Sequence, residues 1–224
     1  HIDSMSDDVV STLPTDIRDE LLCGLICLAV STTDLRAPVS ARITATDATP
    51  SAGGVTEACV SRNLANSLFV HGEHKGAYAR LDWGSAHGDL HPWDKPELPP
   101  DALEAIRACR WHTTHSDHVN IQEAWALRSM IKTRCNEDTQ SETIITITDS
   151  RVLLGACATG RSSSNSLNLV IRSCLGWCIL GRTDIVQCWV ESGDNVSDDP
   201  SRHRSLRPCS EIRPSLAPLI RAEG

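Results

Sequence analysis

Four carboxylates stand where strand-like segments end or a helix begins, and this placement could support metal chemistry. Asp47 and Asp149 each close a stretch of β-forming residues. Glu123 lies one turn into a helical segment, and Asp198 follows the last strand-like segment. Because ligands in layered α/β folds collect in the crevice where strands end, the four acids could meet at one site.

A cluster of this kind implies divalent cations. Magnesium ions need several hard anionic oxygens held close together. With two ions about 3.5 to 4 Å apart, one activates water and the other stabilises the leaving 3′ oxygen, which suits phosphodiester hydrolysis. Each acid also has an ordinary alternative. An Asp at a strand end is commonly a turn or cap residue, a Glu in a first helical turn favours the helix dipole, and Asp198 beside Asp199 could be an N-cap pair.

The elements that would position these acids follow from hydrophobic periodicity. Two strand-like segments separated by a turn that contains Pro50 and Gly53 predict a hairpin. After a gap, a helix, a strand, two helices and a further strand follow. This order indicates an α/β or mixed-sheet layered fold. The first expected elements are a helix over 16–30, capped by Thr15 or Asp16, and the two hairpin strands over 39–47 and 55–61. A helix from Asn120, with Glu123 in a capping box, precedes a strand over 142–149. A short helix then ends at 159, a longer one covers 165–180, and the last strand covers 184–190.

Residues 62–117 do not follow either periodicity, apart from a short helix expected over 102–110. Loops this long are unusual inside a compact domain, so the segment is interpreted as an insertion or a partner-binding element. It is rich in histidines whose spacing could suit zinc, although no CxxC pair accompanies them and a structural zinc site is the lesser alternative. These residues are His71, His74, His87, His91, His112, His115 and His118.

Bulk composition limits the class of protein. The 224 residues suit one large domain or one domain with extensions, and 40% hydrophobic residues suffice for a core. The longest apolar run, 21–30, is about half the length that spans a bilayer, so no membrane is expected.

With no visible leader, the ten cysteines indicate a reduced intracellular compartment, cytoplasm or nucleus, with pairs such as Cys23/Cys27 and Cys174/Cys178 buried on helix faces. The net charge of −8 argues against strong free-standing binding of nucleic acid.

A sharper indication comes from four stretches in a fixed order. The segment 148–164, followed by Leu167-Asn168, resembles the ribonuclease H region of reverse transcriptases from DIRS-type (tyrosine-recombinase) retrotransposons. The stretches 34–38 leading to 45–48, 118–123 and 189–202 resemble the same region. The resemblance covers about residues 34–204, and 62–117 match it poorly.

The resemblance implies a ribonuclease H-like fold, a mixed five-stranded sheet flanked by helices. It also implies that Asp47, Glu123, Asp149 and Asp198 are catalytic and hold two Mg²⁺ or Mn²⁺ ions for cutting the RNA strand of RNA–DNA hybrids. The 2′-hydroxyls would distinguish RNA from DNA. Residues 1–33 would be an N-terminal extension or connection helix from a polymerase domain, 34–206 the ribonuclease H-like domain, and 207–224 an extended tail. A polymerase domain or another subunit would be a possible partner.

Other features leave alternatives open. Arg161 and Ser162, Ser163 and Ser164 could bind backbone phosphates, or could simply form a capped helix start. Many ribonucleases H carry a histidine in the loop before the last acid, whereas 184–197 contain none, so His203 or no histidine would serve. The chain could therefore be an active nuclease, a catalytically weak or inactive scaffold or interaction domain, or a related metal nuclease that acts on DNA.

Overall fold

The computed structural model describes residues 12–50, 52–73, 100–115, 122–136, 141–210 and 214–220. The chain divides into two compact units, residues 1–33 and 34–224. The first unit contains helix α1 (Thr15–Leu28), which has no buried side chain and exposes all four of its leucines and Ile26. Its N-cap residue is Pro14 and no side chain caps it, so the predicted cap at Thr15 or Asp16 is wrong.

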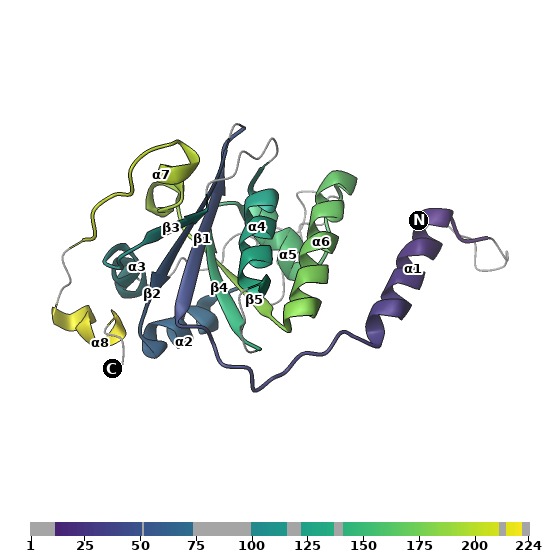
Figure 1. Cartoon of the computed structure of the whole chain (residues 1–224), viewed down its shortest axis with the longest axis horizontal. Helices are drawn as coiled ribbons and strands as arrows, with labels where there is room; N and C mark the ends of the chain where they lie inside the picture. The colour runs from purple at the N-terminus through teal and green to yellow at the C-terminus, as the bar shows by residue number, and fades with distance from the viewer. Residues whose placement is uncertain are drawn as a thin grey trace, which may run out of the picture. The chain divides into compact units, whose positions relative to one another are not determined.

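The second unit is built on a five-stranded mixed sheet with the order β3-β2-β1-β4-β5 (Figure 1). Strands β1 and β2 form the predicted antiparallel hairpin, β3 pairs antiparallel with β2, and β4 lies parallel to both β1 and β5. With its flanking helices, this sheet confirms the α/β class and is the arrangement expected of a ribonuclease H-like fold. The strands are β1 (Arg42–Ala48), β2 (Gly53–Cys59), β3 (His112–His115), β4 (Thr143–Thr148) and β5 (Asp184–Trp189).

Helices cover both faces of the sheet and bury a separate apolar cluster on each (Figure 1). One cluster packs under α2 (Arg62–His71) and α3 (Pro100–Arg107). The other packs under α4 (Gln122–Asn136), α5 (Arg151–Thr159) and α6 (Asn165–Gly181). Short helices follow at η2 (Ser192–Asp194), α7 (Asp198–Ser201), η3 (Pro214–Leu216) and α8 (Ala217–Ile220).

The alternation of residues along the central strands explains why both faces are covered. In β1, Ile43 and Ala45 belong to the cluster under α2 and α3. In β4, Ile145 and Ile147 join the same cluster, while Ile144 points into the cluster under α4. All six residues of β4 are buried, as expected for a strand with a helix layer on each side.

The described part of 62–117 is more regular than its sequence suggested. Helix α2 was not predicted, yet Leu64 and Leu68 are fully buried and Ser61 caps the helix by accepting a hydrogen bond from the Leu64 N–H. The edge strand β3 was also missed, whereas α3 agrees with the expected short helix. The predicted extended tail is wrong over 214–220, which form η3 and α8.

All ten cysteines are free. On α6, Cys174 is buried and Cys178 partly so, as the spacing of four residues predicted. On α1 the prediction is wrong, because Cys23 is exposed and Cys27 only partly covered.

Candidate metal centre

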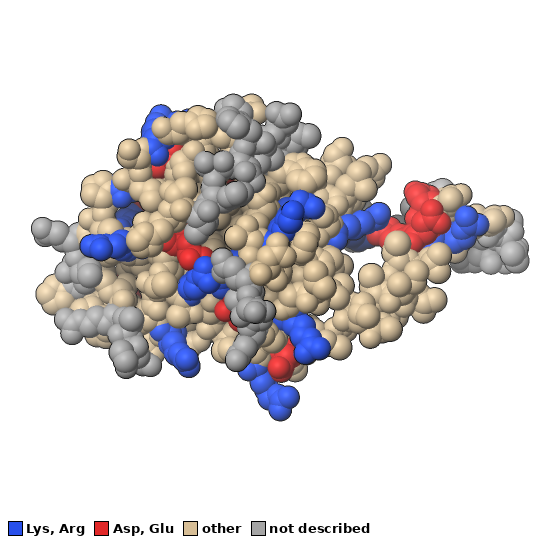
Figure 2. Space-filling view, viewed as in Figure 1, with Lys and Arg blue, Asp and Glu red and all other residues tan. Residues whose placement is uncertain are grey.

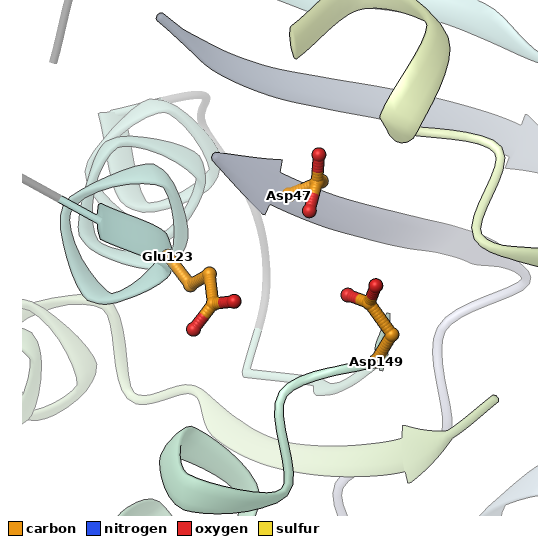
Figure 3. A group of neighbouring side chains, drawn as sticks. All are labelled: Asp47, Glu123 and Asp149. Carbon is orange, nitrogen blue, oxygen red and sulfur yellow. The ribbon is translucent and has the colours of Figure 1, made fainter. Parts of the chain in front are cut away.

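Three of the four predicted carboxylates meet at one end of the sheet: Asp47, Glu123 and Asp149 (Figure 3). One carboxylate oxygen from each lies within 4.8 Å of the others. Asp47 is near the end of β1 and Asp149 directly follows β4, and these neighbouring parallel strands end at the same edge. Glu123 comes from the first turn of α4. The fold therefore collects three acids from segments far apart in the sequence.

Asp47 is the most buried member of this acidic triad, with 6% of its surface exposed. The Ser201 hydroxyl donates a hydrogen bond to its Oδ2. The pKa of Asp47 is raised from 3.8 to about 6, mainly by burial, with the carboxylates of Asp149 and Asp198 acting in the same direction and the Ser201 hydroxyl and the Ala48 backbone N–H acting against them. A bound cation would relieve this cost of holding negative charge at the site.

Asp149 is oriented by the segment that follows β5. The Nδ2 of Asn195 donates to Oδ1 of Asp149 at 2.9 Å and to the Thr46 carbonyl at 3.0 Å. Asn195 is fully buried, and its own Oδ1 accepts from the Ser197 N–H at 3.1 Å. The Ser192 hydroxyl donates to the other carboxylate oxygen of Asp149. Asn195 thus ties the ends of β1 and β4 together beside the triad.

Sequence reasoning treated the residues at 193–195 only as the break after the last strand. That break is present as η2, but the roles of Ser192, Asn195 and Ser201 at the triad were not anticipated. The available signal was the polar run from Glu191 to Ser201, which has no apolar periodicity and lies inside a stretch already singled out for its resemblance.

The structure does not place Asp198 in the group of three. Its Oδ1 accepts a hydrogen bond from Arg202 Nε at 2.5 Å, one turn further along the chain. It still lies close enough to contribute to the raised pKa of Asp47. Its predicted role as a fourth metal ligand therefore stays a prediction.

A glycine allows the C-terminal segment to reach the triad. Gly54 of β2 pairs with Asp47 of β1. A Cβ added at Gly54 would lie 2.6 Å from the Ser197 carbonyl oxygen and 2.7 Å from the Ser201 backbone nitrogen. Only a residue without a side chain lets α7 approach the strand this closely, and this approach brings the Ser201 hydroxyl to Asp47.

The residues proposed from chemistry to bind phosphate, Arg161 and Ser162 to Ser164, form the turn between α5 and α6. Ser164 caps α6 by accepting from the Leu167 N–H. Asn168 makes two hydrogen bonds with Ser162: its Oδ1 accepts from the Ser162 N–H at 2.6 Å, and its Nδ2 donates to the Ser162 carbonyl at 2.8 Å. These contacts agree with a capped helix start, and a role in phosphate binding stays a prediction.

The chemistry of the triad fits a hard divalent cation. All three side chains offer oxygen only, which Mg²⁺ and Mn²⁺ prefer, and none supplies the nitrogen or sulfur typical of zinc sites. Within the residues that the structure describes, no Lys, Arg or His forms an ion pair with any of the three. Across the described ranges, this is also the one group of three or more metal-ligating side chains that lie together. Most of the predicted zinc-binding histidines, including His74, His87, His91 and His118, lie outside the described residues.

No protein-family model matches the chain, and no curated protein matches it at a significant level. Among the described residues, no helix combines the length and the apolar character needed to cross a membrane.

Proposed function

We propose that this chain is a metal-dependent nuclease of the ribonuclease H type that cuts the RNA strand of RNA–DNA hybrids. The observation that carries the proposal is the triad of Asp47, Glu123 and Asp149, gathered at the end of a ribonuclease H-like sheet without a cation of its own among the described residues. The four resembling sequence stretches supply the substrate class and the link to a retroelement reverse transcriptase.

In this proposal the triad holds Mg²⁺ or Mn²⁺, and Asp198 joins it to complete a two-ion site. Bound there, the metal would activate water and stabilise the leaving oxygen of a phosphodiester. The protein's own part is to hold the oxygens in place. Asn195 and Ser192 fix the Asp149 carboxylate, and Ser201 fixes that of Asp47.

The test is cleavage of a labelled RNA–DNA hybrid in Mg²⁺ or Mn²⁺, beside an all-DNA duplex. We expect the RNA strand alone to be cut, and Asp149→Asn to lower the rate at least about a thousandfold while the protein stays folded. Asp184→Asn is the matched control, because Asp184 begins β5 at the opposite end of the sheet. Cutting of the all-DNA duplex would redirect the proposal to a DNA nuclease.

A specific contact favours a second candidate, a ribonuclease H-like scaffold without activity. The pairing of Asp198 with Arg202 withdraws the fourth carboxylate from the triad. If the protein binds hybrid but cuts neither strand at high concentration and low salt, the scaffold becomes the better assignment.

A further inference from the structure

The helix layer formed by α4, α5 and α6 is basic, in contrast to the chain as a whole. The chain has 29 acidic and 21 basic residues, yet residues 150–183 contain four arginines and no acid. Helix α4 adds Arg128 and Lys132, together with Arg134, which is buried against Glu57 and Glu142, and a single acid, Glu123, which belongs to the triad. In Figure 2, basic surface drawn in blue lies over the part of this face formed by α4 and α6. The layer therefore carries more basic than acidic residues, as the binding of a polyanion requires.

One cation of this layer is held in place next to the triad. Arg151 is the first residue of α5, two residues after Asp149, and its side chain is exposed. Its guanidinium lies over the Trp189 ring, 4.3 Å from the ring centroid. The indole Nε1 of Trp189 in turn donates to the Asp149 carbonyl at 3.0 Å. One tryptophan thus connects the backbone of a triad residue to an exposed cation.

This arrangement suits recognition of phosphate. Stacking on an aromatic ring restricts the long arginine side chain, so less entropy is lost when the guanidinium binds a partner. A guanidinium that lies over a ring still presents its N–H donors around its edge, where they can bind phosphate oxygens in pairs. Among the described residues, no carboxylate forms an ion pair with Arg151, so its charge is available for a ligand.

We infer that Arg151, seated on Trp189, binds a backbone phosphate of the nucleic acid whose cleavage site lies at the triad. The inference rests on the proposed function and names the surface that would hold its substrate. It also bears on the objection raised by the net charge of −8, because residues 150–183 contain arginines and no acid.

The experiment measures hybrid binding by the full chain in Mg²⁺ over a range of salt concentrations, in a Glu123→Gln background that prevents cleavage. We expect Arg151→Gln to weaken binding about fivefold to tenfold and to reduce the salt slope by about one, as for the loss of one phosphate contact. Arg151→Lys should keep the slope and recover part of the affinity, because it retains the charge without the planar fork. With cleavage-competent protein, Arg151→Gln should raise KM and leave kcat within about twofold.

Arg62→Gln is the matched control. Arg62 is likewise an exposed first residue of a helix that follows a capping serine, but α2 covers the other face of the sheet. If Arg151→Gln and Arg62→Gln bind with the same affinity and slope, the inference is overturned, whether or not the protein cuts hybrid. If Arg151→Gln alone weakens binding while wild-type protein cuts nothing, the surface assignment holds and the nuclease proposal fails.

Discussion

The two ends of the central sheet differ in how the charges of their buried and partly buried acids are compensated. At the end where β1 and β4 begin, Glu57 and Glu142 surround Arg134, which is only 3% exposed. Arg42 also pairs with Glu57, at 2.8 Å. At the other end, Asp47, Glu123 and Asp149 lie together, and none of them forms an ion pair within the described residues.

Helix α4 joins the two ends, with Glu123 near its start and Arg134 near its finish. Burying a charge is expensive unless a partner compensates for it. Glu57 and Glu142, at one end of the sheet, pair with Arg134 of the chain itself. At the triad, Arg202 pairs with Asp198 and attracts Asp47 and Asp149 only from a longer range, so within the described residues these acids have no ion-paired cation, and this is the strongest structural reason to expect a ligand cation.

The largest expected effect is at the compensated end. Arg134→Met should lower the free energy of unfolding by about 3 to 5 kcal/mol, because Glu57 and Glu142 lose the cation buried between them. Chemical denaturation measures this loss. Mn²⁺ affinity of the folded variant should stay at the wild-type value. A loss below about 1 kcal/mol would mean that the two ends do not differ in the way described.

Asn195→Ala tests how the triad is held. It removes the donor shared by Asp149 and the Thr46 carbonyl, so we expect a stability loss of about 2 to 4 kcal/mol and hybrid cleavage reduced about a hundredfold. Asn168→Ala is the matched control, because Asn168 makes a similar pair of hydrogen bonds to Ser162, and neither residue belongs to the triad. Cleavage by folded protein should fall only for Asn195→Ala. If both folded variants cleave equally well, Asn195 has only a structural role.

Asp47→Asn should reveal the charge cost at the uncompensated end. Because the pKa of Asp47 is raised from 3.8 to about 6, its neutral form is favoured in the fold, and the stability this provides is lost as the pH rises through about 6. Metal-free Asp47→Asn should therefore match the wild type near pH 4 and exceed it by up to about 3 kcal/mol above pH 7. Thermal melts across this range measure the difference.

Excess Mg²⁺ should stabilise the wild type and leave Asp47→Asn unchanged, so the gap between them narrows. A variant that is less stable than the wild type at every pH would show that the Asp47 carboxylate is compensated within the protein.

How much of the fold and of the acidic site the sequence predicts depends on how far apart along the chain the interacting residues lie. Alternation along β4 and β5 and the apolar spacing of α4 and α6 are local patterns, and these elements were expected nearly where they lie. Strand β3 has the sequence His-Thr-Thr-His, with no apolar alternation, and exists because it pairs with β2. Such an edge strand depends on its neighbour, and its own residues do not predict it.

The same distinction applies to the site. Asp47 and Asp149 were found because an acid at a strand end is a local feature. Asn195 lies 149 residues from Thr46, whose carbonyl it binds, so its role depends on the folded sheet. Asp198 was expected in the group of acids, but pairing with Arg202, four residues away, competes with that placement.

The smallest effect, at Gly54, tests whether the C-terminal segment must approach the sheet for the acidic end to form. Gly54→Ala forces the added methyl against the backbone of Ser197 and Ser201, which cannot move as a flexible side chain would. We expect a stability loss of about 1 to 2 kcal/mol from overpacking and a weaker Mn²⁺ affinity, because Ser201 moves away from Asp47. Calorimetric titration of the folded variant with Mn²⁺ measures the second effect.

Gly193→Ala is the control in the same segment, since nothing lies within 4 Å of an added Cβ there. If Gly54→Ala keeps the wild-type Mn²⁺ affinity while losing stability, the segment supports the fold, and the strands and α4 alone define the acidic end.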